Sequence, residues 1–288
     1  MFSFTRCILV VFDFFERQKM RTTRRWKICF LILLPLMLLL GCMTNARADT
    51  YQGLWWNANE SGWGMSITQH SNMVFAALYT YDGAGHPTWY VMSSCPISAN
   101  SCTGDIYKVV NGTSPLLPWN GVPKDVSSAG TGTLTFTDTN TGTFNYILNG
   151  ISGSKSISRQ IFATGTTQPA VDYTDLWWNP NESGWGVALT QQYEVIFAAW
   201  YTYDSSGNAI WYVASRCAVT HDFYRDSCIG ELYQFTAGRS LTSAWDSSAM
   251  TSVVVGTVTF TFTDTSNGSM SYSINGVTGS RVITRQGF

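Results

Sequence analysis

Several segments of the chain alternate apolar and hydroxyl residues with a period of two. Residues 132–137 read Gly-Thr-Leu-Thr-Phe-Thr, residues 258–263 read Val-Thr-Phe-Thr-Phe-Thr, and residues 269–274 continue the pattern. Side chains alternate between the two faces of a strand, so this period is typical of half-buried β-strands. No segment of residues 49–288 shows the apolar stripe of an amphipathic helix. The pattern therefore predicts an all-β fold.

Turn signals separate these predicted strands. The dipeptides at residues 149–150 and 275–276 are both Asn-Gly, a strong signal for a two-residue hairpin. In the first half we expect eight strands, which begin near Leu54, Gly64, Val74, Thr88, Asp105, Thr133, Thr143 and Ser154. Eight sequential antiparallel strands with short connections close naturally into an up-and-down barrel, which leaves no exposed edge.

The second half of the chain repeats the first. Residues 54–64 read LWWNANESGWG and residues 176–186 read LWWNPNESGWG, so ten of eleven positions are identical. The correspondence then extends through both units, each of about 115 residues, which is a normal size for a small domain. We therefore expect two tandem eight-stranded antiparallel up-and-down barrels, with two β-sandwiches as the alternative.

The repeat also sets the expected domain boundaries. They are a targeting segment at residues 1–48, a first β-repeat at 49–163, a linker at 164–170 and a second β-repeat at 171–288. Residues 1–19 precede an ordinary signal peptide that begins at Met20, which indicates a start site assigned too far upstream.

The targeting segment has the layout of a signal peptide. Four basic residues between positions 21 and 27 precede the apolar run 28–40, which is short for a membrane span of about 20 residues. An A-x-A site ending at Ala48 predicts soluble export, whereas the lipobox-like residues 39–42 predict an acylated Cys42. The third interpretation is an uncleaved membrane anchor. We expect a periplasmic, outer-membrane-lipoprotein or secreted location, with the membrane contacted only through the signal or lipid anchor.

Composition and charge narrow the classes of partner. Charged residues make up 12% of the chain, about half the usual share. Residues 1–48 hold eight Lys/Arg and two Asp/Glu, which leaves residues 49–288 with nine basic and 16 acidic side chains, a net charge of −7. An acidic body without a basic run gives no surface for a phosphate backbone, so no nucleic-acid partner is expected.

The exported part contains two cysteines per repeat. An even count in an oxidising compartment predicts disulfides, and because each unit should be self-contained we expect Cys95–Cys102 and Cys217–Cys228. In the chain-entropy model each short loop gains roughly 2–3 kcal/mol. No histidine is duplicated, so neither a shared metal site nor a His-based triad is expected, and no cofactor is predicted.

The duplicated tryptophans are the strongest indication of a binding site. They are Trp55, Trp56, Trp63 and Trp89 in the first repeat and Trp177, Trp178, Trp185 and Trp211 in the second. Adjacent residues of a strand face opposite sides, so one of each Trp-Trp pair lies outside its barrel. An outward ring can stack on a sugar or an amphipathic ligand. The alternative is that it packs where one repeat meets the other, which residues 74–79, apolar on both faces, also favour.

Two duplicated acids, Glu60 and Glu182, lie among these tryptophans. Glycoside hydrolases use two carboxylates, one of them desolvated, but no second partner is evident here. We therefore favour a structural role for Glu60, either an ion pair with Arg159 or a cap on the turn at residues 61–62.

Two resemblances bear on the architecture. Residues 53–55 (Gly-Leu-Trp) with Arg159 resemble the signature of calycin barrels, the lipocalin- and avidin-like folds, in which a last-strand arginine packs across a first-strand Gly-x-Trp. The second repeat has Asp-Leu-Trp at residues 175–177 with Arg285, so the glycine is lost. The whole repeat is similar to Trp-rich repeats of bacterial exported proteins with a WWxPxESGWG motif. The resemblances imply a barrel and no particular activity.

We therefore expect an exported, non-catalytic binding or scaffold protein. The predicted ligand is a carbohydrate or another small amphipathic molecule, held by the duplicated tryptophans together with Glu60, Glu182, Arg159 and Arg285. The alternatives are a structural protein that binds an envelope partner and a glycoside hydrolase that uses Glu60 or Glu182.

Overall fold

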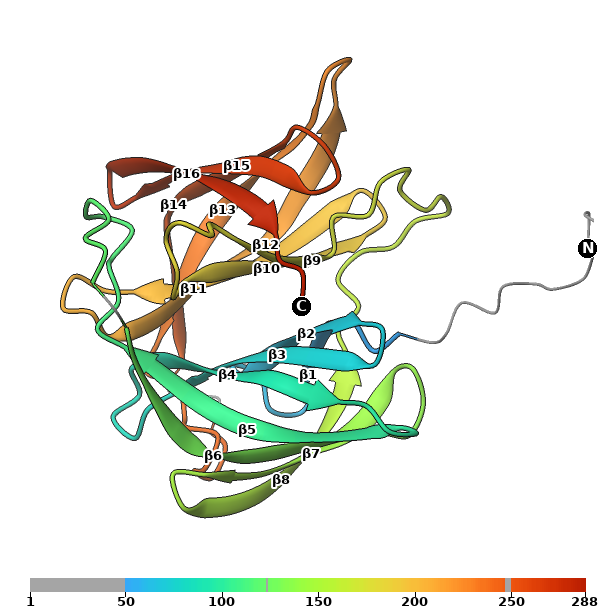
Figure 1. Ribbon diagram of the computed structural model, residues 1–288, viewed down its shortest axis with the longest axis vertical. Helices are drawn as coiled ribbons and strands as arrows, with labels where there is room; N and C mark the ends of the chain where they lie inside the picture. The colour runs from blue at the N-terminus through green and yellow to red at the C-terminus, as the bar shows by residue number, and fades with distance from the viewer. Residues whose placement is uncertain (1–49, 123, 247–249) are drawn as a thin grey trace, which may run out of the picture. The chain divides into compact units, whose positions relative to one another are not determined.

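The computed structural model describes residues 50–288 except 123 and 247–249, and within this part the chain forms strands and no helices (Figure 1). The first eight strands are β1 (Gly53–Trp56), β2 (Gly64–His70), β3 (Met73–Tyr81), β4 (Pro87–Pro96), β5 (Ser101–Val110), β6 (Asp125–Phe136), β7 (Thr141–Leu148) and β8 (Ile151–Arg159). The next eight are β9 (Asp175–Trp178), β10 (Gly186–Gln192), β11 (Val195–Tyr203), β12 (Ala209–His221), β13 (Asp226–Thr236), β14 (Thr251–Phe262), β15 (Asn267–Ile274) and β16 (Val277–Arg285).

Each set of eight strands closes into an antiparallel up-and-down barrel. In the first barrel β1 pairs with β8 through Trp55 opposite Arg159, and in the second β9 pairs with β16 through Trp177 opposite Arg285. The predicted barrels are therefore confirmed and the sandwich alternative is wrong. β5 and β6 begin earlier than expected, because their ends pair with each other beyond the clearly alternating residues.

The predicted targeting features lie outside the part of the chain that the structure describes. This applies to the predicted leader, to Cys42 and to the site ending at Ala48. Among the described residues, no helix has the length and hydropathy needed to span a bilayer.

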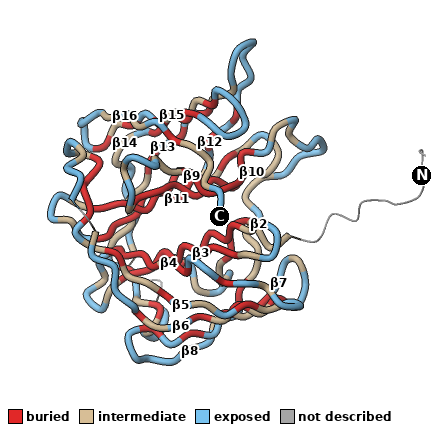
Figure 2. Tube along the Cα trace, in the orientation of Figure 1, coloured by how far each residue is buried: buried red, intermediate tan, exposed pale blue. Residues whose placement is uncertain are grey.

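The hairpin turns follow from the two Asn-Gly dipeptides. Asn149 and Gly150 have φ values of 51° and 80°, and Asn275 and Gly276 have 50° and 82°. Two consecutive positive φ angles define the turn whose twist matches antiparallel strands, and Asn-Gly adopts it at low cost. Between such turns, buried and exposed residues alternate along β7 and β15 (Figure 2).

Glycine allows the long strand β6 to bend around the first barrel. Gly130 has a φ of 138° at a register shift between β5 and β6, and a Cβ there would collide with the carbonyl oxygen of Ile147. Gly256 occupies the same place in β14, against Ser273. A glycine bulge of this kind is a common device for closing barrels.

Large apolar side chains fill the interior of the first barrel. Leu134 and Phe136 of β6 are buried, and the space beside Met65, Tyr90 and Phe144 measures about 10 Å³. Such a space has room for about one water molecule. The interior is therefore a packed core, whereas larger or emptier barrels enclose a ligand.

Both predicted disulfides are present. Cys95–Cys102 joins β4 to β5 with an S–S distance of 2.12 Å, and Cys217–Cys228 joins β12 to β13 with 2.04 Å. All four of these cysteines are buried. Two such bonds indicate an oxidising, extracytoplasmic environment.

The outer faces of β3 and β4 pack against those of β11 and β12. Trp89 Nε1 donates a hydrogen bond of 2.9 Å to the carbonyl oxygen of Thr202, and Trp211 Nε1 donates one of 3.1 Å to that of Thr80. The two bonds join equivalent positions of the repeats, so the interface is self-complementary, as in a two-fold dimer. It explains why residues 74–79 are apolar on both faces.

The loop between the fifth and sixth strands of each barrel reaches the other barrel. Leu241, in the loop after β13, is 2% exposed within the core of the first barrel, and its carbonyl oxygen accepts a 2.8 Å hydrogen bond from Tyr146 Oη. Reciprocally, the Pro115 carbonyl oxygen, in the loop after β5, accepts a 2.8 Å bond from Tyr272 Oη. We call residues 111–122 and 237–246 the exchanged loops.

Candidate functional site

In each barrel the first-strand tryptophan packs against the last-strand arginine. Trp55 is 1% exposed and donates a 2.8 Å hydrogen bond from Nε1 to the Tyr51 carbonyl oxygen, with Arg159 Cζ 5.1 Å from its ring centroid. The Arg159 guanidinium donates to backbone carbonyl oxygens on both sides, and burial lowers its pKa. Trp177 and Arg285 repeat the contact at 5.2 Å. These four predicted site residues therefore close the barrel ends.

The predicted ion pair of Glu60 with Arg159 is wrong. Lys155 Nζ lies 2.6 Å from Glu60 Oε2, and Trp63 Nε1 donates to the same oxygen at 3.3 Å. Lys155 lies four residues before Arg159 on the same face of β8, and it is nearer the β1–β2 loop. Arg159 instead uses its donors on the backbone carbonyl oxygens described above.

The second acid has an equivalent partner. Glu182 Oε2 lies 2.9 Å from Arg281 Nε, and both side chains are 18% exposed. Trp185 beside it is buried. A half-buried acid paired with a cation is most simply a structural ion pair. The contacts of Glu60 and Glu182 are thus those of structural ion pairs. They do not place a second carboxylate beside either acid.

The adjacent tryptophans face opposite sides, as predicted. Trp55 lies inside the first barrel, whereas Trp56 is half-exposed outside it; Trp177 and Trp178 are arranged in the same way. Trp89 and Trp211 also point outward but are buried at the contact between the barrels. Of the duplicated tryptophans, Trp56 and Trp178 are therefore the two that are only partly buried.

A cleft of about 370 Å³ lies between the two barrels at Trp56. The first barrel contributes β1, the β1–β2 loop, the start of β2, Tyr79 and Gln160, and the second contributes side chains of β11, β12 and β13 with Met250 and Ser252. Its main aromatic and apolar lining residues are Trp56, Trp63, Phe197, Trp211, Phe235 and Met250. We call this the inter-barrel cleft. Its size and apolar lining are those of a small-molecule site.

Two stacked rings form the second-barrel wall of the inter-barrel cleft. The centroids of Trp211 and Phe235 are 5.1 Å apart with an interplanar angle of 23°. Neighbouring strands β12 and β13 carry the two residues. Sequence reasoning missed Phe197, Phe235 and Met250, because their part in the cleft depends on how one barrel packs on the other.

A second, polar hollow of about 440 Å³ lies where the β3–β4 and β11–β12 turns meet. Asp82 and Asp204 line it, but each carboxylate folds its own turn. Asp82 Oδ1 accepts bonds of 2.8 Å from the Ala84 amide and 2.9 Å from the His86 amide, and Asp204 Oδ1 is bonded in the same way. The two acids are the turn-forming residues that their sequence context indicates.

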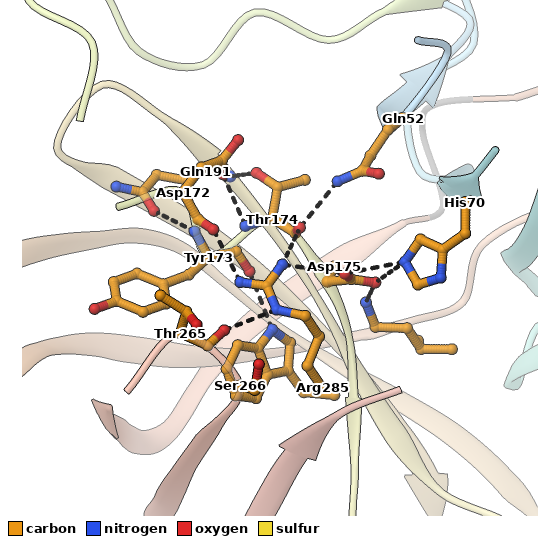
Figure 3. A network of polar contacts seen from close by, with 12 residues as sticks. Gln52, His70, Asp172, Tyr173, Thr174, Asp175, Gln191, Thr265, Ser266 and Arg285 are labelled. Atoms are coloured by element: carbon orange, nitrogen blue, oxygen red, sulfur yellow. Dashed lines mark hydrogen bonds and ion pairs between the residues drawn. The ribbon is translucent and has the colours of Figure 1, made fainter. Parts of the chain in front are cut away.

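A polar network joins the barrels on another side (Figure 3). His70 Nε2 lies 3.0 Å from Asp175 Oδ1, and Arg285 Nη1 lies 3.1 Å from Asp175 Oδ2. Phe288 stacks on the His70 ring with centroids 4.3 Å apart. Asp175 is 5% exposed, so its charge is held between a cation and an imidazole. The network fastens the C-terminal residue and β9 to β2.

The sequence carried a signal for this network. Position 175 corresponds to Gly53, whose φ is 137° and where a Cβ would lie 2.9 Å from Arg159 Nη1. An aspartate in its place would be unfavourable unless it had cationic partners. The lost glycine therefore pointed to a new polar contact in the second repeat.

The β12–β13 hairpin carries the most exposed aromatic residues in the part of the chain that the structure describes. Phe223 is 89% exposed and Tyr224 80%, at the tip of the turn closed by the Asp222 amide and the Arg225 carbonyl oxygen. The hairpin extends beyond its neighbours in Figure 1. Its disulfide spans 11 residues against seven in the first repeat, so the tip is an insertion specific to the second.

His221 braces the base of this tip. Its Nδ1 lies 2.8 Å from Asp226 Oδ1 and its Nε2 lies 3.0 Å from Glu194 Oε2. Hydrogen bonds to Asp226 and Glu194 raise the pKa of His221. Within the described residues, no group of three or more His, Cys, Asp or Glu side chains is placed to hold a metal ion.

Comparisons with known proteins give no family for this chain. No protein-family model matches it, and a search of curated proteins finds no significant relative. We therefore infer the function from the geometry of the barrels and of the inter-barrel cleft.

Proposed function

We propose that this protein is an exported, non-catalytic binding protein that holds a small amphipathic molecule in the inter-barrel cleft. The observation that carries the proposal is the apolar space of about 370 Å³ beside Trp56, open at the junction of two packed barrels. Ligand sites are typically concave, apolar and placed where two domains meet.

The barrel architecture supports the position of this site. Calycin barrels, which the Trp–Arg closure resembles, hold a ligand inside the barrel. Here the interior of the first barrel is packed with buried side chains, including Leu241 of the second repeat, which favours the outer junction as the place for a ligand. The periplasm, the outer membrane through a lipid anchor, or the medium are all compatible with the two disulfides.

The lining favours an amphipathic molecule over a carbohydrate. Apart from the indole N–H groups, its side-chain polar groups are those of Gln160, Tyr79, Tyr233 and three serines, whereas aromatic and aliphatic groups make up most of the surface. A sugar needs a hydrogen-bond partner for nearly every hydroxyl it buries, because an unpaired polar group is costly. A largely apolar ligand with one or two polar ends fits this lining better.

The duplication offers a matched test of the site. Trp56→Ala should weaken binding of a neutral fluorescent naphthylamine probe at least tenfold, since one aromatic stacking contact is worth about 1–3 kcal/mol. Trp178→Ala removes the equivalent half-exposed ring outside the cleft and should leave affinity within threefold. Probe fluorescence and intrinsic tryptophan emission report the titrations. Equal losses in both variants, or no probe binding to the unchanged protein, would contradict the proposal.

A second function, binding of an envelope protein, is favoured by the β12–β13 tip. Phe223 and Tyr224 contact each other edge-on with centroids 4.9 Å apart and are otherwise open. Exposed aromatics on a stapled, rigid hairpin suit insertion into a partner's pocket, because little conformational freedom is lost on binding.

This second function can be tested in intact cells. A photocrosslinking residue in place of Tyr224 should give one discrete crosslinked product, whereas the same residue at Val282, which is 64% exposed on β16, should give none. Identical patterns from the two positions would argue against a partner at the tip.

A further inference from the structure

The inter-barrel cleft has an uncharged lining. None of its side chains is Asp, Glu, Lys, Arg or His, although the chain around it carries a net negative charge. Moving a charge into a mainly apolar site without a partner is strongly unfavourable, whereas a neutral ring gains from the same surface. The cleft thus discriminates by charge as well as by shape.

Its phenols do not add charge. Tyr233 Oη donates a 2.7 Å hydrogen bond to Glu231, and this bond raises the pKa of Tyr233. Burial raises the pKa of Tyr79, whose Oη lies 3.4 Å from the Ala199 carbonyl oxygen. Both groups stay neutral at ordinary pH, and the carboxylate of Glu231, outside the lining, further opposes an anion.

The two repeats carry the same residue at some positions of this lining and different residues at others. Trp211, Val213 and Tyr233 correspond to Trp89, Val91 and Tyr107, so these types are kept in both repeats. By contrast, the counterparts of Phe235, Met250 and Ser252 are Val109, Lys124 and Val126.

Met250 and Lys124 occupy equivalent places in space as well as in sequence. A Cβ at Gly62 would lie 2.6 Å from Met250 Sδ, and one at the equivalent Gly184 would lie 2.6 Å from Lys124 Cγ. The fold therefore accepts either side chain against this turn. At the inter-barrel cleft it presents the uncharged thioether.

We infer that the inter-barrel cleft selects uncharged ligands with a flat ring system and excludes anions built on the same ring. The ring contacts Trp56 from the first barrel and the stacked Trp211–Phe235 wall from the second. A hydroxyl or amine on the ligand is served by the serines and Gln160 at the edges. This inference rests on the proposed function, since it names the chemical class that the site takes.

Two probes with one skeleton test the inference. N-phenyl-1-naphthylamine is neutral, and 8-anilinonaphthalene-1-sulfonate carries the same rings with one negative charge. The neutral probe should bind at least tenfold more tightly, by competition titration on the full exported chain. The measurement is made in 1 M NaCl, where the Debye length is about 3 Å, so that the net charge of the protein is screened.

A positive charge introduced into the uncharged lining provides the decisive variant. Met250→Lys, which copies the residue found at the equivalent place in the first repeat, should raise affinity for the sulfonate probe at least tenfold. It should change affinity for the neutral probe less than threefold. Val254→Lys places the same charge on an exposed site of β14, 52% exposed and outside the lining, and should leave both affinities unchanged.

The outcomes distinguish a failure of ligand binding from a failure of charge selection. If the neutral probe does not bind at all, the proposed function itself fails. If both probes bind the unchanged protein equally, ligand binding stands and charge selection is overturned. Charge selection is also overturned if Val254→Lys raises sulfonate binding as much as Met250→Lys does.

Discussion

Replacing Leu241 with alanine is expected to lower the free energy of unfolding of the first barrel by about 2–5 kcal/mol, the usual cost of a large-to-small change in a core. Leu241 belongs to the second repeat, yet it is 2% exposed among core residues of the first. Urea unfolding followed by tryptophan emission, with hydrogen exchange on β6 and β7, would locate the loss.

The other exchanged loop supplies the control. Leu117 is 47% exposed, and Leu117→Ala should change stability by less than about 0.5 kcal/mol. If exchange rates in β6 and β7 did not rise in Leu241→Ala, the loop would not be part of the first barrel's core in solution.

Trp89→Ala is expected to cost about 3–5 kcal/mol and to uncouple the two barrels. Trp89 is 1% exposed, packs on Tyr201 and Tyr203 with centroids 5.1 and 5.7 Å away, and bonds to Thr202. Calorimetry should show one transition for the unchanged protein and two for the variant.

Trp89→Phe is the milder change in the same place. It keeps a buried aromatic ring but loses the Nε1 donor and part of the ring volume, so it should cost less than Trp89→Ala and retain a single transition. A Trp89→Ala protein that still unfolds in one step at nearly the same temperature would show that the interface contributes little.

The barrels could be predicted from the sequence because their rules are local. Alternation along residues 258–263 sets which side chains enter the core, and the dipeptide Asn275-Gly276 sets the hairpin twist. The pairing Cys95–Cys102 followed from duplication alone. Each of these depends on neighbours in the chain or on the repeat.

The contacts between barrels could not be predicted in this way. Phe235 enters the inter-barrel cleft, and Leu241 a foreign core, because of how two closed surfaces meet, and no periodic pattern encodes that. The error at Glu60 has a related cause. Lys155 and Arg159 lie on the same face of β8, and only the position of the β1–β2 loop along the strand decides which of them the acid meets.

The exchanged loops also determine the order in which the two barrels can be completed during folding. The contacts of Tyr146 with Leu241 and of Pro115 with Tyr272 span 95 and 157 residues. Contacts this distant form late, because their loop-closure entropy must first be overcome. A chain interrupted before residue 237 therefore lacks part of the first core. The tandem pair, and not a single repeat, is thus the unit that must fold to complete the first barrel.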